Sequence, residues 1–390
     1  MSEREVAIVS YARTPFGKAN KGTLKDTRPD DMAAHAIDAV LEETPEVDPS
    51  TIEDVVLGCA FPEAEQGTNV ARISSILAGL PVEVPAMTVN RFCSSGVQTI
   101  SIAAERIMSG AIDIAIAGGT ESMSMIPMGG NNPSANPRLM EEMPEIYIGM
   151  GNTAENVAEK YDISREQQDE FAYRSHQRAT EAWERGFFEG EVVPMETSVV
   201  REDGTRKEVT AAKDENVRPE TSLDVLAKLP AAFTDGGVVT PGNASPLTDG
   251  AAAVMVMTKE KADELGLEPM GYYRTMQVAG VPPEIMGIGP VPAVRKLMDH
   301  TGMSVDDIDL FELNEAFASQ SVYCSEELGI DLDKLNVNGG AIAVGHPLGV
   351  SGTRMAGTIL RALEENDGRW GVVTMCVGGG MGAAALFERA

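Results

Sequence analysis

Short apolar runs alternate with amphipathic segments along the chain. Four runs dense in apolar residues predict strands: Val6–Ser10, Ile52–Gly58, Ala86–Asn90 and Ile112–Ala117. The strand at Ala86–Asn90 is expected to be fully buried. Apolar positions recur near helical spacing in Asp30–Glu43, and a second helix is predicted over Ser95–Met108. This order of strand, helix and strand predicts a layered α/β fold in which helices cover the sheet.

The second half of the chain repeats the pattern of the first. Ten residues from Ile52 to Phe61 align without a gap on Ile308 to Phe317, and four of the ten are identical. In each half a reactive polar residue then follows in a glycine- and serine-rich turn, and a helix and a strand ending in glycines come after it. This shared order of elements predicts an internal duplication.

A region of different character separates the two halves. It opens with a stretch rich in Met, Gly, Pro and Asn (122–150), continues with a helical segment (167–185) and contains a charged, strand-poor run (201–229). We therefore expect three domains: an N-terminal half of residues 1–117 and 247–268, an inserted loop domain of residues 118–246, and a C-terminal half of residues 269–390. The methionines of the first stretch could line an adaptable apolar pocket or pack under a long loop.

The charge balance restricts the function. Against 60 Asp and Glu there are 31 Lys and Arg, which gives a net charge of −29, while 43% of the residues are hydrophobic. That apolar content excludes a disordered acidic chain, and the acidity argues against nucleic-acid binding. The 31 basic residues divide into 11 Lys and 20 Arg, which fits a salt-adapted source or an ordinary acidic enzyme. Neither a signal peptide, a membrane span nor a peroxisomal C-terminal tripeptide is recognisable, so we expect a cytoplasmic protein that does not bind membranes.

Cys93 is the first candidate for catalysis. None of the four cysteines forms a Cys-x-x-Cys pair, which argues against a disulfide scaffold or a structural zinc site. Cys93 lies between a predicted strand and a predicted helix, followed by Ser94, Ser95 and Gly96. The N-terminus of a helix favours the thiolate and lowers a thiol pKa, so Cys93 is a candidate nucleophile, although a lone cysteine is more commonly a buried structural residue.

His346 is the second candidate. It lies in the segment 338–352, where six of fifteen residues are Gly or Pro, so we expect a rigid loop that a ligand can approach closely. His35, His176 and His300 lie within or at the end of helical patterns, and packing is the better interpretation of each.

Two further positions complete the set. Cys376 ends a strand before a glycine cluster that includes Gly378, so it is either a second reactive thiol beside free backbone N–H groups or a core cysteine. Asn314 ends the strand of the duplicated segment and could hold a water or a carbonyl, or serve as a turn residue. Neither a G-x-G-x-x-G fingerprint in the first βα turn nor a P-loop is present, which disfavours a nucleotide-binding fold.

The motifs Cys-Ser-Ser-Gly at Cys93, Gly-His-Pro at His346 and Cys-Val-Gly-Gly-Gly at Cys376 occur in the order and spacing of the thiolase family, which the chain resembles from Ala12 to Gly382. The resemblance implies the thiolase-like fold, two duplicated layered α/β halves with an inserted loop domain. It also implies an acyltransferase that cleaves a 3-ketoacyl-CoA with CoA, or condenses two acyl-CoA molecules in the reverse direction.

The resemblance assigns a role to each candidate. Cys93 would attack the ketone and carry the acyl group as a thioester, and His346 would take the thiol proton. Cys376 would protonate the departing acetyl-CoA carbanion. Asn314 would hold a water that binds an oxyanion together with His346, and the backbone N–H groups of Cys93 and Gly378 would form a second oxyanion hole. Coenzyme A would be a co-substrate, with no metal and no permanently bound cofactor.

The resemblance also places coenzyme A on the loop domain, with Arg218 and Ser245 at family contact positions. Between residues 201 and 228, however, six basic residues face seven acidic ones, so the sequence predicts no basic patch for the phosphates. The family forms homodimers or homotetramers, and a hydroxyacyl-CoA dehydrogenase is a possible partner.

Details of the motifs favour the degradative branch of the family. The segment before Thr153-Ala-Glu-Asn is short, and Gly149 stands where biosynthetic acetyl-CoA acetyltransferases carry a His. The segment 84–91 and the C-terminal Phe-Glu-Arg resemble 3-ketoacyl-CoA thiolases of β-oxidation. The alternatives are the biosynthetic enzyme that makes acetoacetyl-CoA and a non-catalytic acyl-CoA-binding relative, which the intact Cys93, His346 and Cys376 disfavour. A ketoacyl synthase would need a second histidine at the third position.

Overall fold

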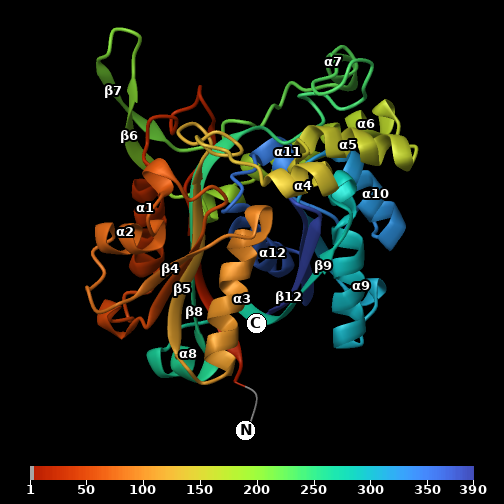
Figure 1. Cartoon of the computed structure of the whole chain (residues 1–390). Helices are drawn as coiled ribbons and strands as arrows, with labels where there is room; N and C mark the ends of the chain where they lie inside the picture. Colours follow the sequence, from red (N-terminus) through yellow and green to blue (C-terminus); the bar gives the residue numbers. More distant parts are fainter. Residues whose placement is uncertain (1–3) are drawn as a thin grey trace.

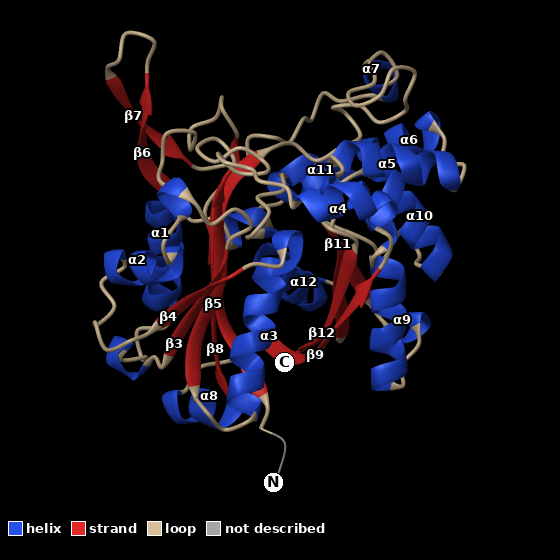
Figure 2. Ribbon diagram, viewed as in Figure 1, coloured by secondary structure: helices blue, strands red, loops and turns tan. Residues whose placement is uncertain are grey.

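Two groups of strands form the framework of the molecule, with helices between and outside them (Figures 1 and 2). The computed structural model describes residues 4–390. The first group contains β1 (Val6–Arg13), β2 (Gly17–Lys18), β3 (Asp54–Gly58), β4 (Ala86–Val89), β5 (Ile114–Ser122) and β8 (Thr248–Thr258). The second contains β9 (Gly271–Gly280), β10 (Leu310–Leu313), β11 (Trp370–Val377) and β12 (Met381–Arg389). The predicted α/β class is therefore confirmed.

The two groups share one pattern of pairing. In the first, β3 is parallel to β5, β5 is antiparallel to β8, and β8 is antiparallel to β1. In the second, β10 is parallel to β11, β11 is antiparallel to β12, and β12 is antiparallel to β9. The predicted duplication is confirmed by this repeat. The groups join where β1 pairs with β9, with Val6 opposite Tyr273, so their hydrogen-bonded ladders are continuous.

Two central helices lie between the strand groups. α3 (Ser95–Met108) and α12 (Ser351–Glu365) pack against each other and against strands of both groups (Figure 2). A Cβ atom on Gly96 would lie 2.6 Å from the backbone nitrogen of Thr353. A Cβ atom on Gly352 would lie 2.3 Å from the backbone nitrogen of Val97. Only glycine allows so close an approach. The first turns of the two helices therefore meet at one place.

Other helices cover the outer faces. α1 (Pro29–Glu43) packs on β1, β5 and β8, with α2 (Val70–Leu77) beside it. On the other side, α9 (Pro290–Thr301) packs on β9 and β12, and α10 (Ala318–Leu328) packs on α9. Sheets and helices thus alternate as helix, sheet, helix, sheet, helix. Two further helices are short. α8 (Lys259–Leu265) directly follows β8, and α11 (Ala341–Val344) lies just before His346.

The segment between β5 and β8 lies across one end of both groups (top of Figure 1). It contains α4 (Pro137–Glu142), α5 (Met150–Lys160), α6 (Arg165–Glu184), a hairpin of β6 (Met195–Val200) and β7 (Arg206–Ala211), and α7 (Leu223–Leu226). A buried ion pair anchors it, because the Arg13 guanidinium on β1 lies 2.8 Å from Glu191 and 2.7 Å from Asp214. The division of the chain into three domains at the predicted boundaries stays a prediction.

Three differences from the expected elements have physical reasons. β4 is half-exposed rather than buried, because it is the last strand of its group. β7 lies in the run expected to be strand-poor, and its mostly exposed residues give no apolar alternation. β5 continues through Gly118 and Gly119 to Ser122 instead of ending at the glycines. No helix within residues 4–390 is long and apolar enough to span a bilayer.

Candidate active site

A sharp turn presents Cys93 at the start of α3. Phe92 has a φ of +42°, a conformation that is strained for a bulky residue. Its N–H donates to Asn90 Oδ1 at 2.8 Å, and its carbonyl accepts from Ser95 Oγ at 2.7 Å. These bonds hold the turn, so the thiol that follows is fixed in place at the junction of strand and helix.

The Cys93 thiol is buried, with 8% of the residue exposed. Burial raises the pKa of Cys93 to about 11, although the backbone N–H groups of Gly378 and of Cys93 itself act in the opposite direction. The expectation of a lowered pKa at the helix N-terminus is therefore wrong, because the loss of solvation outweighs the nearby donors. At neutral pH the thiol keeps its proton and needs a base to remove it.

His346 lies in the loop between α11 and α12. Its Nδ1 is 2.6 Å from Ser351 Oγ, whose own hydrogen is donated to the Pro347 carbonyl at 3.0 Å. Nδ1 must therefore carry the ring hydrogen, and Nε2 holds the free lone pair. Nε2 accepts from Asn314 Nδ2 at 3.2 Å. Burial, helped by the charge of Arg354, lowers the pKa of His346 to about 3, so the ring is neutral and able to accept a proton.

Cys376 and Gly378 lie against Cys93. Cys376 is fully buried near the end of β11, in an apolar cluster that includes Met150 and Phe317. Its pKa is raised well above the usual value by burial and then by the neighbouring Cys93 sulfur. The Gly378 N–H faces the Cys93 sulfur. The structure thus brings these three predicted residues together.

Asn314 joins this group through the sheet. It directly follows β10, and its N–H donates to the Thr374 carbonyl on β11 at 2.9 Å. Its side chain is completely buried, and within residues 4–390 the Oδ1 atom has no hydrogen-bond partner. An orphan buried carbonyl next to a histidine lone pair is a place where a water or a polar group of a ligand fits. Within the same residues, His346 and Cys93 form no direct hydrogen bond.

Arg218 and Ser245 have different surroundings. Ser245 donates both its N–H and its Oγ–H to the Ala316 carbonyl at 3.0 Å, so it lies beside the segment that follows Asn314. Arg218 is exposed, and its N–H donates to His176 Nδ1 at 3.2 Å. Burial lowers the pKa of His176 to about 4, which keeps this acceptor neutral. No ion pair is formed by the Arg218 side chain in the described part of the chain.

The sequence assigned no role to two buried carboxylates near the site. Glu121 accepts from the Gly349 N–H at 2.8 Å, and Glu315 accepts from the Ile342 N–H at 3.1 Å. Burial raises the pKa of both. Their hydrogen donors come from distant segments, which the sequence does not reveal.

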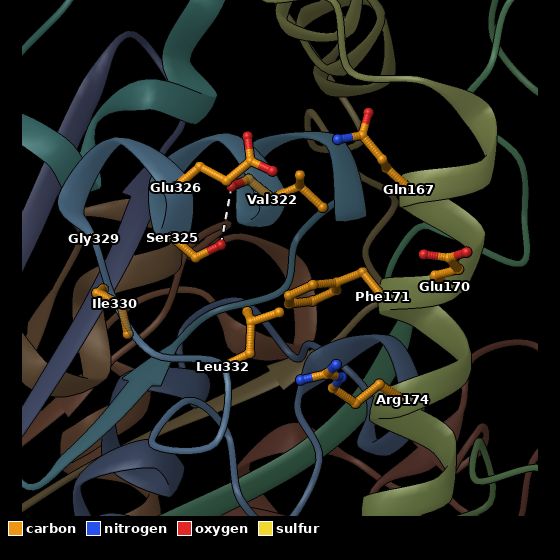
Figure 3. Close-up of a pocket in the computed structure, with 10 residues that line it drawn as sticks. All are labelled: Gln167, Glu170, Phe171, Arg174, Val322, Ser325, Glu326, Gly329, Ile330 and Leu332. Atoms are coloured by element: carbon orange, nitrogen blue, oxygen red, sulfur yellow. Dashed lines mark hydrogen bonds between the residues drawn. The ribbon is translucent and has the colours of Figure 1, made fainter.

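Two pockets in the described part of the chain lie beside the site. Figure 3 shows one between α6 and α10, with Phe171 and Arg174 on one side and Ile330 on the other. It contains none of the predicted site residues. A second pocket, lined by Phe61, Phe92 and other residues, lies next to the Cys93 turn. Nowhere in residues 4–390 are three or more His, Cys, Asp and Glu side chains grouped to hold a metal ion.

Comparison with known families and sequences gives consistent results. Residues 6–260 match the family model described as thiolase, N-terminal domain, and residues 267–389 match thiolase, C-terminal domain. The chain is 53% identical to a 3-ketoacyl-CoA thiolase of Bacillus subtilis over 99% of both chains. It is 46% identical to peroxisomal 3-ketoacyl-CoA thiolase B of Mus musculus over 99% of this chain and 91% of that one.

Solved structures show the same likeness. The dimeric peroxisomal thiolase of Saccharomyces cerevisiae superposes with a TM-score of 0.91 at 40% identity, covering 100% of this chain and 98% of that one. Human mitochondrial 3-ketoacyl-CoA thiolase superposes with a TM-score of 0.90 at 37% identity, and 100% of each chain is covered. The acetyl-CoA acetyltransferase of Bacillus anthracis superposes with a TM-score of 0.90 at 38% identity, covering 100% of this chain and 99% of that one.

Proposed function

The chain belongs to the thiolase family, and from this premise we propose that it is a degradative acyltransferase that cleaves 3-ketoacyl-CoA with CoA in fatty acid β-oxidation. The products are acetyl-CoA and an acyl-CoA two carbons shorter. The observation that carries the proposal is the contact of Cys93, Gly378 and Cys376, with His346 paired to Asn314 beside them. The relatives named 3-ketoacyl-CoA thiolase match almost the whole chain, which favours this activity over the biosynthetic and non-catalytic alternatives.

In the first half-reaction the Cys93 sulfur attacks the ketone carbon and its proton passes to His346 Nε2. The carbon–carbon bond then breaks, and Cys376 protonates the acetyl-CoA carbanion, which leaves an acyl thioester on Cys93. In the second, the Cys376 thiolate takes the proton of free CoA, whose sulfur attacks the thioester. Cys93 departs and regains its proton from His346. The starting state that these transfers require, with both thiols protonated and His346 neutral, agrees with the raised pKa of the thiols and the lowered pKa of His346.

Two sets of donors are available for the negative oxygens that form along this path. The N–H groups of Cys93 and Gly378 already face the Cys93 sulfur, so they lie beside the carbonyl oxygen of an acyl group carried there. The amide of Asn314, with its unpaired Oδ1, supports a bound water that meets the second oxyanion together with His346. Donors placed in advance, in a dry site, are the most effective kind.

We extend the proposal to coenzyme A and to location. Arg218, exposed and outside any ion pair of the described residues, is free to bind a phosphate of CoA, and Ser245 would contact its pantetheine end near Ala316. No permanently bound cofactor is needed for these steps. All four cysteines are free, which fits the reducing cytoplasm.

We also propose a homodimer. The free edge of β4 is half-exposed, and the adjacent α2 and its following turn expose Ile76, Leu77 and Val82, the last by 70%. An unpaired strand edge beside apolar side chains is suited to pairing with a second copy of the chain. The yeast relative is a dimeric protein by its title. A homotetramer and a complex with a hydroxyacyl-CoA dehydrogenase are the alternatives.

The test is CoA-dependent thiolysis of a series of 3-ketoacyl-CoA substrates of increasing chain length, with Cys93→Ala as the control. Turnover of medium and long chains by the wild type, lost in the variant, supports the degradative enzyme. Turnover of acetoacetyl-CoA alone would assign the biosynthetic activity instead. Absence of turnover with every chain length would overturn the proposal.

A further inference from the structure

We infer that Glu121 and Glu315 are positioning residues, two buried carboxylates that hold the loop of His346 from its two ends. In the following, the loop of His346 includes the short helix α11 and means residues 338–350. The inference deepens the proposed function, on which it rests, because it concerns the placement of the base. Neither carboxylate contacts the reacting atoms, so each would act through the loop.

Glu121 holds the C-terminal end of the loop. It is 1% exposed, near the end of β5. One carboxylate oxygen, Oε2, accepts from the N–H groups of Gly349 and Ala60, both at 2.8 Å. The other accepts from the Phe61 N–H at 3.3 Å and from Gln66 Nε2. Glu121 therefore connects the loop, three residues beyond His346, to the end of β3 in the other half of the molecule.

The carboxylate of Glu121 is balanced without a counterion. No Lys, Arg or His within residues 4–390 forms an ion pair with it, and its side-chain contacts are all with hydrogen donors. A group surrounded only by donors must be an acceptor at both oxygens, as an ionised carboxylate is. Such a charge, buried and held mainly by backbone N–H groups, fixes the position of the backbone segments that supply them.

The close packing of the backbone around Gly349 leaves no room for the loop to take another position. A Cβ atom on Gly349 would lie 2.8 Å from Cys59 Cα, and one on Gly119 would lie 2.1 Å from the Gly349 carbonyl oxygen. A Cβ on Gly58 would lie 2.7 Å from the same oxygen. The loop is thus packed backbone against backbone on β3 and β5, and the bonds to Glu121 set its register there.

Glu315 holds the N-terminal end of the loop. It is also 1% exposed, and it accepts from the Ile342 N–H at 3.1 Å, four residues before His346. Ser175 Oγ donates to it at 2.6 Å and in turn accepts from the Gly340 N–H at 3.1 Å. Asn336 Nδ2 completes the set at 2.8 Å. His346 is therefore held between two anchored stretches of backbone.

This arrangement matters because Cys93 and His346 come from different halves of the molecule. The proton transfer between them depends on how the halves are registered, and Glu121 is a bond across that boundary. A displacement of about 1 Å in a catalytic geometry can cost about a hundredfold in rate. Replacing either carboxylate by an amide directs an NH₂ group at another hydrogen donor, from the backbone around Glu121 and from the backbone or Asn336 around Glu315, while nearly preserving side-chain volume.

The experiment compares Glu121→Gln and Glu315→Gln with the wild type, using Asp309→Asn as the matched control. Asp309 also accepts two backbone N–H groups, from Arg369 and Trp370 at 2.8 Å, but where β11 begins, away from the loop. We expect kcat for thiolysis to fall 10- to 100-fold in both Gln variants with KM changed less than twofold, and the control to stay within twofold of wild type.

A second readout does not depend on turnover. Alkylation of Cys93 by iodoacetamide requires loss of the thiol proton, so we expect it to slow at least fivefold in the Gln variants and to be unchanged in Asp309→Asn. Circular dichroism and a thermal melt show which variants are folded. If one Gln variant does not fold, the other decides, since each anchors a different end of the loop.

Folded Gln variants with kcat and alkylation rates within twofold of wild type would overturn the inference. So would a rise in KM with unchanged kcat, or an equal loss in the control. If the wild type cleaves no 3-ketoacyl-CoA, the proposed function fails, while the alkylation rates still decide whether the two carboxylates position His346.

Discussion

His346 Nε2 lies 3.2 Å from Asn314 Nδ2, so the lone pair of the proposed base is already occupied by an amide donor. The side chain that holds the imidazole in its neutral tautomer thus also competes for the atom that must take up a proton. The partner of Nε2 therefore acts on the proton affinity of the ring in addition to burial, and this relationship can be tested by changing Asn314.

Asn314→Asp would place a carboxylate beside Nε2. The negative charge favours the imidazolium, so the pKa of His346, now lowered to about 3, should rise by about 1–3 units, and the ring would be protonated over part of the acid range in which the wild-type ring is neutral. A protonated ring cannot act as the base. We expect the acid limb of the pH profile of kcat/KM to move upward by about 1–3 pH units. Asn314→Ala should lower activity at every pH without moving that limb; an identical shift in both variants would contradict the role of charge.

Two buried neutral histidines should make stability depend on acid pH. Burial lowers the pKa of His346 to about 3 and that of His176 to about 4. In the unfolded chain both take up a proton below pH of about 6.5, whereas in the folded chain they do not. Unfolding then binds protons, so the free energy of unfolding falls as pH decreases from about 6.5 towards about 4, by up to about 1.4 kcal/mol per pH unit for each histidine.

His176→Asn isolates one part of this effect. The amide oxygen can accept the Arg218 N–H in place of Nδ1, and it does not titrate. We expect a shallower loss of melting temperature between pH 6.5 and 4.5 than in the wild type. His300→Asn, at an exposed position near the end of α9, is the control and should leave the slope unchanged. Equal slopes for all three proteins would contradict the prediction.

Gly349→Ala should destabilise the protein and impair catalysis together. Its Cβ would lie 2.8 Å from the Gly58 carbonyl and from Cys59 Cα, and backbone atoms cannot move aside as a flexible side chain does. We expect a loss of about 1–3 kcal/mol in a denaturant titration, with kcat reduced as well. Gly280→Ala, whose Cβ would have its nearest neighbour 4.0 Å away, should be close to neutral.

The proposed dimer predicts a change in oligomeric state. Val82→Asp combined with Leu77→Asp places two charges on the exposed apolar surface beside β4. We expect light scattering after size exclusion to give the dimer mass for the wild type and the monomer mass, 41.4 kDa, for the double variant. A dimer in both would show that the contact lies elsewhere. Val225→Asp, at an exposed apolar position on α7, is the control.

The net charge of −29 predicts a salt-dependent stability. Like charges repel in the folded state, and at about 1 M salt the screening length falls to about 3 Å. We expect the melting temperature to rise steadily between about 0.1 M and about 1 M KCl. Sucrose at matched osmolality controls for excluded-volume effects. A melting temperature independent of KCl would mean that ion pairs already compensate the acidic surface.

The sequence predicted the fold, and it marked the segments that form the candidate site, because glycines mark where backbones approach. The turn at Cys93 and the loop of His346 are recognisable from small residues around one reactive side chain, and the structure puts both at helix starts. The repeat of Ile52–Phe61 in the second half predicted the duplicated pairing of strands. Both kinds of feature, a local cluster of small residues and a repeated segment, can be recognised in the amino-acid sequence without knowledge of distant contacts.

What the sequence did not predict depends on contacts between distant segments. The pKa of Cys93 is raised because other parts of the chain bury the thiol, which outweighs the local helix end. The roles of Glu121 and Glu315 depend on N–H groups of segments far along the chain, 228 and 27 residues away. The exposure of β4 depends on its place at the edge, which strand pattern alone does not give.

The central pair of helices has a consequence for how the two halves depend on each other. α3 and α12 occupy equivalent places in the two halves, and each covers the apolar face that the other would leave open. A chain with only one copy of the unit would expose that face to water. The contact between α3 and α12 is therefore built like an interface between two subunits, although it lies inside one chain. Because the two halves are distinct segments of that chain, one can carry the nucleophile Cys93 and the other the base His346.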